Sequence, residues 1–333
     1  MKKGAVVILN YNGESVLRTF LPSVIQHSTL DCWVIDNAST DDSILLLESE
    51  FPEVFLIRLQ SNFGYAGGYN WGLEELRGKY EYFILLNSDV EVTPSWDLEL
   101  ITFLESNPDF AAVQPKILSW QNRSQFDYAG AGGGFLDAFG YPYCRGRIVN
   151  HVEQDKSQYD DSIPVDWASG ACLAIRADDF FLEGGFDAHF FAHMEEIDLC
   201  WRLRNRGRRI GYHGKVAVFH QGGATLDRSS PRKLYLNIRN SLNMIYKNES
   251  GFRFFLIFLG KVVWEGLGLI SYILKGEFEM AQAIGKGYRD SIEQKSLLQK
   301  SKKIPGLLVV RSGQVKSILW NYFVLRKRKF SEL

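Results

Sequence analysis

The chain has 333 residues, of which 46% are hydrophobic, so it can bury a sizeable core and is not expected to be disordered. Its 38 Lys and Arg residues nearly balance its 39 Asp and Glu residues, which argues against nucleic acid as a partner. The four cysteines are scattered without a CxxC pair, which argues against a zinc site and predicts reduced cytosolic thiols.

The N-terminal part alternates short apolar runs with helical patterns, as in a parallel α/β sheet. The first run, Ala5–Leu9, is too short for a signal peptide, so we expect the chain to begin in the cytoplasm. Strands are predicted at Ala5–Leu9, Trp33–Ile35, Val54–Leu59 and Tyr82–Leu86, and helices at Val16–Ile25, Ser43–Phe51 and Ser95–Asn107.

The second half begins with a segment rich in Gly, Tyr and Asp, from Ser119 to Ile163, which predicts irregular structure. From Pro231 onward the pattern is helical, and residues 1–230 and 231–333 are predicted to form two parts of the molecule. Between these segments the pattern predicts a strand at Val165–Ile175, a helix at Ala177–Glu183, a turn at Gly184–Gly185, a helix at Met194–Arg206 and a strand at Lys215–Phe219.

Three predicted strands end in a polar residue: Asn10, Asp36 and Asn87. Ligands of open α/β sheets bind beyond the carboxyl ends of the strands, so these side chains are candidates for a binding site. Asp36 in particular could accept hydrogen bonds from a base or a ribose. The alternative is that Asp36 only forms a turn and that residues 39–41 cap the next helix.

A glycine-rich segment, Asn62–Gly72, lies between a predicted strand and a helix. Its backbone N–H groups could approach phosphate oxygens, but the segment lacks the Gly-Lys-Ser/Thr of a P-loop. Glycines also serve tight turns and close helix packing, so this segment alone decides little.

Acidic residues and one histidine complete the candidate site. Asp89 follows a buried strand, where a carboxylate could hold Mg²⁺ or Mn²⁺, although an exposed turn is the simpler interpretation. Glu195, Glu196 and Asp198 open a predicted helix, where the helix dipole alone would favour acids. Asp198 can pair with Arg202 four residues on. His220 ends a strand, where a lone histidine is more often merely exposed.

Taken together, several ordered segments resemble glycosyltransferase family 2, and within it the rhamnosyltransferase-like members. The segments that carry the resemblance are Ile8–Asn12, Ile35–Asp41, Asn62–Gly72, Asn87–Asp89, Gly184–Asp187 and Glu195–Arg202. The resemblance runs from about Val6 to His220, and Pro231–Asn243 also looks familiar.

The resemblance implies a GT-A type α/β fold with a mostly parallel central sheet, here followed by a C-terminal helical extension. It also implies a nucleotide-sugar donor, a divalent metal (Mg²⁺ or Mn²⁺) and inversion at the anomeric carbon. Asp36 looks like the nucleoside contact, Asp89 like the metal-binding aspartate, and His220 matches a position that can join the metal or the diphosphate. The donor-binding residues expected with Asp36 are Asn10, Asn12, Asn62, Gly64, Gly67, Asn70 and Asn87.

Two departures from the family pattern matter for the chemistry. The usual DxD is Asn87-Ser88-Asp89 here, so metal binding should depend on Asp89, the diphosphate and His220. The usual Glu-Asp catalytic pair is Glu195-Glu196, which makes Glu196 the expected base and Glu195 the reserve.

The long apolar stretch Phe254–Leu274 contains Lys261 and Glu265, whose charges argue against a transmembrane helix and favour an interfacial one. A basic, aromatic segment near the C-terminus would suit anionic headgroups; the alternative is a packed helical hairpin with a solvated tail. We therefore expect an enzyme at the cytoplasmic face of the cell membrane.

The predicted activity is transfer of a sugar, with rhamnose favoured, from a dTDP- or UDP-sugar to a glycan or lipid-linked glycan in cell-surface polysaccharide synthesis. The alternatives are a UDP-hexose transferase of the same family and a nucleotide-sugar binding module without catalysis. A dinucleotide oxidoreductase is disfavoured because the segment Asn10–Gly13 is not GxGxxG.

Overall fold

The computed structural model describes residues 1–222, 230–304, 313 and 315–333. Its centre is a nine-stranded mixed sheet. In spatial order the strands are β11 (Ser162–Val165), β13 (Arg209–His220), β6 (Phe110–Ser119), β12 (Cys172–Arg176), β4 (Tyr80–Asn87), β1 (Lys2–Asn10), β2 (Asp31–Asp36) and β3 (Phe55–Arg58), and β5 (Val90–Glu91) pairs with the end of β13.

Most strands of this sheet run in one direction. β1, β2, β3 and β4 pair in parallel, and β6 pairs in parallel with β13, whereas β12 lies antiparallel between β4 and β6. The carboxyl ends of β1, β2, β4 and β13 therefore meet at one edge, with Asn10, Asp36, Asn87 and His220 as their last residues. The predicted α/β fold with a mostly parallel sheet is confirmed.

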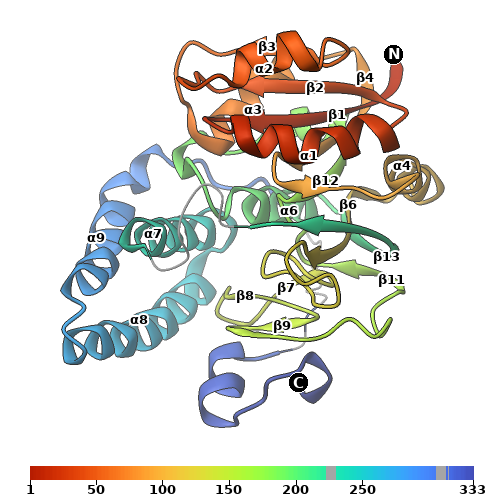
Figure 1. Ribbon diagram of the computed structural model, residues 1–333. Helices are drawn as coiled ribbons and strands as arrows, with labels where there is room; N and C mark the ends of the chain where they lie inside the picture. Colours follow the sequence, from red (N-terminus) through yellow and green to blue (C-terminus); the bar gives the residue numbers. More distant parts are fainter. Residues whose placement is uncertain (223–229, 305–312, 314) are drawn as a thin grey trace.

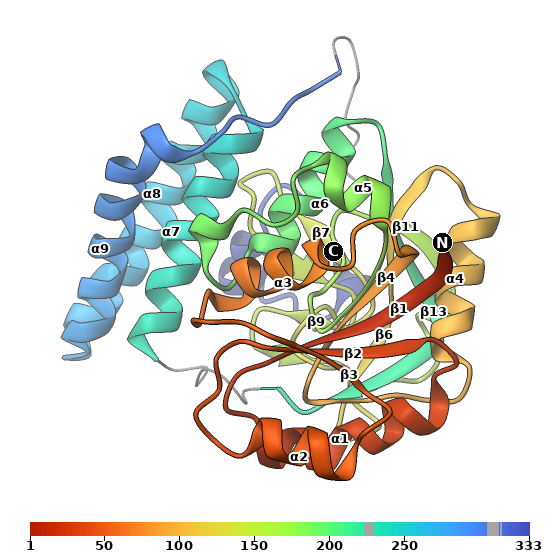
Figure 2. The ribbon, with the colours of Figure 1, turned by 90° about the horizontal axis from the view of Figure 1, so that it is seen from above.

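Helices cover both faces of the sheet (Figure 2). Val6 and Ile8 of β1 pack with α1 (Glu14–His27), α2 (Ser43–Glu50) and α4 (Trp96–Ser106). Ala5 and Val7, which point to the opposite face, pack with α3 (Gly64–Glu74), α5 (Ala177–Leu182) and α6 (Glu195–Asn205).

The segment from Ser119 to Ile163 is more regular than predicted. It forms a second, antiparallel sheet of β7 (Gly134–Leu136), β8 (Pro142–Cys144), β9 (Arg147–Ile148) and β10 (His151–Val152). Glycines such as Gly133 and Gly146 adopt positive φ angles next to these strands. The glycine-rich composition that predicted irregular structure therefore allows tight turns between very short strands. The predicted strand at Val165–Ile175 is likewise wrong as a single element, because it divides into β11 and β12.

The glycine-rich segment Asn62–Gly72, which the sequence placed between a strand and a helix, is itself largely helical, because Gly64 begins helix α3. A Cβ at Gly68 would lie 2.7 Å from the Leu9 side chain, and a Cβ at Gly72 would overlap Ile35. These glycines therefore let α3 lie close against β1 and β2, which is the packing role that glycine-rich sequences also serve.

Three long helices follow the sheet domain and form a layer at one side of it (Figure 1). They are α7 (Pro231–Asn248), α8 (Gly251–Leu274) and α9 (Phe278–Gln294), which confirms the predicted helical extension. α7 packs against both α6 and α9. The predicted boundary after residue 230 adjoins residues 223–229, which lie outside the described residues, and it stays a prediction.

Candidate functional site

The polar residues at the ends of β1 and β2 form one hydrogen-bonded group. Asn10 Nδ2 donates to Asp36 Oδ1 and to Ser39 Oγ, both at 3.2 Å, and the Ser39 N–H donates to Asp36 Oδ2 at 2.9 Å. Asp36 thus forms the turn that the simpler interpretation predicted, while lying buried at the sheet edge. Asn10 Oδ1 is buried and has no hydrogen-bond partner in the described part of the chain, which leaves one unsatisfied acceptor in this group.

Asn12 and Asn62 shape the backbone around this group. Asn12 Oδ1 accepts the Thr40 N–H at 2.7 Å. Asn62 Oδ1 accepts the Gly64 N–H at 2.8 Å and an amide hydrogen of Asn37 at 3.1 Å. The two predicted donor-binding asparagines therefore order the loops that enter α2 and α3, and α3 begins beside Asn37, whose amide also donates to the Gly64 carbonyl at 3.1 Å.

Asn70 and Gly67 lie on α3 itself. Asn70 donates to the Phe186 carbonyl at 2.7 Å and accepts the Phe186 N–H at 2.9 Å, so its amide is used to fasten the segment before α6. A Cβ at Gly67 would lie 2.8 Å from Phe63 Cβ. The roles of Asn70 and Gly67 in donor binding stay predictions.

A second group lies where β4 and β13 end. His220 Nε2 lies 3.2 Å from Asp89 Oδ1, and His220 Nδ1 lies 3.1 Å from Asp127 Oδ2. Asn87 Nδ2 approaches His220 Nε2 at 3.4 Å, and Asp89 Oδ2 accepts the Gly222 N–H at 3.0 Å. Asp89 and His220 are both buried, so the exposed-turn and exposed-histidine interpretations are wrong.

Charge pairing within this group changes the acidity of its members. Burial disfavours the charged imidazole, but hydrogen bonds and charges from Asp127 and Asp89 outweigh it and raise the pKa of His220 to about 10. Burial would raise the pKa of Asp89, yet the His220 contact holds that pKa below its ordinary value. Sequence reasoning missed Asp127, which sits alone in a segment without periodicity.

Asp89 and His220 offer the donor types that Mn²⁺ accepts, a carboxylate oxygen and an imidazole nitrogen. Within the described part of the chain, no group of three or more His, Cys, Asp or Glu side chains is arranged to hold a metal ion. Because a pKa of about 10 keeps the His220 imidazole protonated at neutral pH, His220 can bind a metal only after it loses that proton, and the metal-binding roles of Asp89 and His220 stay predictions.

Glu195 and Glu196 open α6 and carry unusual electrostatics. Each has a buried carboxylate oxygen, Oε2, that has no hydrogen-bond partner among the residues that the structure describes. Burial raises the pKa of Glu196 to about 7. Burial, and then the charge of Glu196, raises the pKa of Glu195 well above its ordinary value. At neutral pH one member can stay protonated while Glu196 accepts a proton.

Tyr65 of α3 lies between the end of β4 and the Glu195–Glu196 pair. Its hydroxyl donates to the Gly170 carbonyl at 2.9 Å, and the next residue, Ala171, accepts the Asn87 N–H at 3.0 Å. Burial first, and then the charges of Tyr69, Glu195 and Glu196, raise the pKa of Tyr65. The strand ends and the glutamate pair are thus connected through the first turn of α3.

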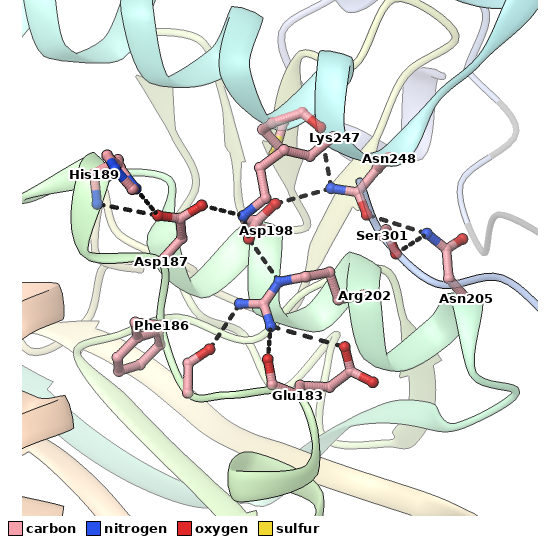
Figure 3. Close-up of polar contacts among 12 residues, drawn as sticks. Glu183, Phe186, Asp187, His189, Asp198, Arg202, Asn205, Lys247, Asn248 and Ser301 are labelled. Carbon is pink, nitrogen blue, oxygen red and sulfur yellow. Dashed lines mark hydrogen bonds and ion pairs between the residues drawn. The ribbon is translucent and has the colours of Figure 1, made fainter. Parts of the chain in front are cut away.

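The next turn of α6 belongs to a buried polar network that joins it to α7 (Figure 3). Asp198 accepts from Arg202 Nε and Lys247 Nζ, both at 2.7 Å, and from Asn248 Nδ2 at 2.9 Å. Lys247 also contacts Asp187 at 2.6 Å. The predicted pairing of Asp198 with Arg202 is confirmed, and it leaves Glu195 and Glu196 as the free carboxylates of this helix start.

The sequence model described as Glycosyl transferase family 2 matches residues 5–145. The low-salt glycan biosynthesis hexosyltransferase Agl10 of Haloferax volcanii is 26% identical over 242 residues, which are 71% of this chain and 73% of the relative. The N-acetylglucosaminyl-diphospho-decaprenol L-rhamnosyltransferase of Mycobacterium tuberculosis is 25% identical over 264 residues, which are 74% of this chain and 85% of the relative.

Among solved structures, the mannosyltransferase PcManGT of Pyrobaculum calidifontis, in complex with GDP-Man and Mn²⁺, superposes with a TM-score of 0.53. The likeness covers 87% of each chain at 12% sequence identity. It shows the GT-A fold.

Proposed function

We propose that this chain, which matches the glycosyltransferase family 2 model over residues 5–145 and resembles a hexosyltransferase and a rhamnosyltransferase, transfers a sugar, with rhamnose favoured, from a nucleotide sugar to a hydroxyl of a glycan or lipid-linked glycan. A dTDP- or UDP-sugar is the proposed donor, and cell-surface polysaccharide synthesis is the proposed process. The observation that carries the proposal is the Glu195–Glu196 pair, whose buried oxygens have no partner within the described protein.

In the proposed reaction Glu196 acts as the general base. The acceptor hydroxyl gives its proton to the Glu196 carboxylate while its oxygen forms a bond to the anomeric carbon. The bond from that carbon to the diphosphate oxygen breaks on the opposite face, which inverts the configuration, and the nucleoside diphosphate leaves with the bonding electrons. A pKa near 7 gives Glu196 a useful fraction of the ionised form at neutral pH.

Donor binding is proposed at the strand ends. Asn10 and Asp36 would contact the nucleoside, with Asn87 nearby at the end of β4. Asp89 and His220 would hold a divalent cation, which neutralises the charge that develops on the diphosphate. The Mn²⁺ in the related mannosyltransferase supports this part of the proposal.

Membrane contact is proposed for α8, whose charged residues face the protein interior and whose apolar residues face outward, the reverse of a helix on the surface of a soluble protein. Its buried residues are Ile257, Lys261 and Glu265, with Lys261 Nζ and Glu265 Oε1 2.7 Å apart. Leu267 and Leu274 are 56% and 83% exposed. The helix is long and apolar enough to cross a bilayer, with a mean hydropathy of 1.7.

We favour an in-plane position for α8 over a spanning one, because the inward-facing charges bind the rest of the protein. Tyr141 Oη donates to Glu265 Oε1 at 3.1 Å, and Lys261 Nζ lies 3.8 Å from the centre of the Tyr141 ring. Such a helix would lie at the cytoplasmic surface with its apolar side in the lipid, near a lipid-linked acceptor. A membrane relation suits the decaprenol-linked acceptor named for the mycobacterial relative.

The test is a donor panel of dTDP-, UDP- and GDP-sugars with Mn²⁺, Mg²⁺ or EDTA, in which nucleotide release is measured for wild type, Glu196→Gln and Glu195→Gln. We expect metal-dependent turnover of one donor, loss of that turnover in Glu196→Gln with nucleotide affinity retained, and a smaller loss in Glu195→Gln. Full activity in Glu196→Gln would reject the assigned base, and binding of a donor without turnover at any acceptor would favour the non-catalytic module.

A further inference from the structure

The backbone that leads into Glu195 and Glu196 adopts an uncommon conformation. Phe191, His193 and Met194 have φ angles of 63°, 71° and 73°, in the left-handed region that residues with side chains rarely adopt. Each such residue costs about 1–2 kcal/mol, so residues 189–194, here called the approach loop, require contacts that hold them in place.

Those contacts come from α7, in the C-terminal helical part. The side-chain amide of Asn240 faces three carbonyls of the approach loop, those of Phe190 at 2.9 Å, Ala192 at 2.9 Å and His193 at 2.7 Å. Asn240 is fully buried. A single buried side chain thus binds the carbonyls on both sides of the residues with positive φ.

The neighbouring Arg239 completes the attachment. Its Nη2 donates to the carbonyls of His189 and Phe190, both at 3.0 Å, and its Nε donates to Asn240 Oδ1 at 2.9 Å. The guanidinium therefore binds the start of the approach loop and also orients the Asn240 amide so that its N–H groups face the carbonyls.

The opposite side of the approach loop is bonded to the start of α3. The N–H groups of Tyr65 and Ala66 donate to the Phe191 carbonyl at 2.7 and 3.2 Å. Gly64 has a φ of 71°, and a Cβ there would lie 2.6 Å from the same carbonyl oxygen. The approach loop is consequently held between the first turn of α3 and α7.

We propose that Arg239 and Asn240 are positioning residues for the transfer reaction, which hold the approach loop so that the Glu196 carboxylate keeps its place and its shielding from water. This inference rests on the proposed function, because it takes Glu196 as the base. It assigns part of the C-terminal helical region to the active site, where the sequence had suggested only membrane contact or a packed helical hairpin.

Asn243 offers a matched comparison on the same helix. It is also fully buried, but it accepts a hydrogen bond from Ser291 Oγ of α9 at 2.7 Å, and within the described residues its side chain makes no hydrogen bond to the approach loop. Replacing either asparagine by leucine removes a buried amide of similar size from α7. Only the change at 240 should alter the approach loop.

The experiment measures kcat, KM and the pH dependence of kcat for wild type, Asn240→Leu and Asn243→Leu, with the donor found in the panel and with melting temperature recorded for each. We expect kcat of Asn240→Leu to fall on the order of 100-fold, since displacement of a reacting group by about 1 Å has that effect. The pH at which kcat reaches half its maximum should fall below about 7, because water that reaches Glu196 in a loosened approach loop lowers the pKa of its carboxyl. Asn243→Leu should have a lower melting temperature than wild type but the same kcat and the same pH midpoint of kcat.

The titratable groups around Glu195 and Glu196 would not by themselves lower the midpoint of kcat in Asn240→Leu. Glu195 lies on the same helix, Tyr65 faces the pair from α3, and His193 lies near Lys233 of α7. Burial first, and then the charge of Lys233, lowers the pKa of His193 to about 4, so this imidazole stays neutral across the assay range. None of these residues changes in either variant.

A glycine at a strained position provides the second test. Met194→Gly removes the cost of a positive φ, so the double variant with Asn240→Leu should recover kcat severalfold over Asn240→Leu alone. Arg239→Gln serves if Asn240→Leu does not fold, and the same loss and shift are expected. The positioning role is overturned if folded Asn240→Leu or Arg239→Gln keeps the wild-type kcat and midpoint while Glu196→Gln is inactive. Activity in Glu196→Gln would instead overturn the proposed base.

Discussion

The glutamate pair, in which Glu195 is buried and Glu196 half-buried, determines how activity should depend on pH. Glu196 must be ionised to accept a proton, and burial raises its pKa to about 7. We expect kcat to rise with pH through a midpoint near this value and to level off above it, as measured by nucleotide release from pH 5 to 9. A midpoint near 4.5, the ordinary value for glutamate, would mean that the carboxylate is hydrated in the working enzyme.

The same burial should make Glu196 costly to the folded state. Its pKa is raised on folding, so the unfolded chain releases this proton at lower pH and stability falls as pH rises from about 4.5 to about 7. We expect Glu196→Gln to be more stable than wild type by on the order of 1–3 kcal/mol at pH 8. Urea unfolding measures this difference.

At pH 4 the two proteins should unfold at the same urea concentration, because a protonated glutamate and a glutamine are alike in charge. A variant that is less stable than wild type at pH 8 would contradict the assignment of Glu196 as a desolvated, unpartnered carboxylate.

Individual site residues were predictable where a local pattern placed them. Asn10, Asp36, Asn87 and His220 follow strands that apolar runs indicate, and parallel strands bring their ends together. Asp127 follows no such run, and its contact with His220 spans 93 residues. A single aspartate in a glycine-rich segment gives no sequence signal for such a pairing, because the pairing depends on how β6 and β13 lie in the sheet.

At the scale of elements, α8 gives the clearest prediction. Its outward surface is apolar, and Arg253 and Lys275 lie near its two ends, where they suit anionic headgroups. We expect the protein to sediment with phosphatidylglycerol vesicles and Leu267→Glu to reduce that binding, because a carboxylate on the lipid-facing side must stay hydrated.

Leu182→Glu is the matched control for this change. Leu182 is 67% exposed on α5, compared with 56% for Leu267 on α8, so both substitutions add one charge in place of an exposed leucine. Only the change on α8 should weaken vesicle binding. Equal binding by both variants would contradict α8 as the membrane surface, and equal sedimentation with phosphatidylcholine would show that headgroup charge plays no part.

Elements were predictable where periodicity alone decides them, and α3 shows where it does not. Its sequence contains Gly64, Gly67, Gly68 and Gly72, and glycine lowers helix propensity by about 1 kcal/mol per residue relative to alanine. Local preference therefore predicts a loop. The helix forms because it buries Ala66, Tyr69 and Leu73 against the sheet. Leu9 and Ile35 leave no room for a Cβ at Gly68 and Gly72, a tertiary requirement that no short window of sequence contains.

At the scale of the whole molecule, the question is whether the C-terminal helices unfold with the sheet domain. Lys247 of α7 is buried between Asp187 and Asp198, which belong to the segment before α6 and to α6 itself (Figure 3). Asn248 adds hydrogen bonds to Asp198 and Asn205. This network joins the two predicted parts through buried charges, so we expect calorimetry to show one cooperative transition.

Lys247→Met should therefore destabilise the whole protein and leave it with a single transition. Loss of the ammonium removes the cation between the buried Asp198 and the half-buried Asp187, and breaking a buried ion pair on one side costs about 3–5 kcal/mol. Lys215→Met, on an exposed position of β13, should change stability by less than about 0.5 kcal/mol. Two separate transitions, with only one of them lowered by Lys247→Met, would mean that residues 231–333 form an independent unit.

The penalty of Lys247→Met should also depend on pH, and the direction follows from Asp187. Burial would raise the pKa of Asp187, but the charge of Lys247 outweighs burial and lowers it below 3.8. The stability that this pair adds is thus present above the ordinary aspartate pKa and is lost as pH falls through the lowered one. In the variant, Asp187 takes up its proton at higher pH, so the difference in melting temperature from wild type should be largest near pH 7 and should shrink towards pH 3. A difference that stays constant over this range would show that Lys247 stabilises the fold through packing, as its position 5.1 Å from the centre of the Phe190 ring allows, and not through its charge.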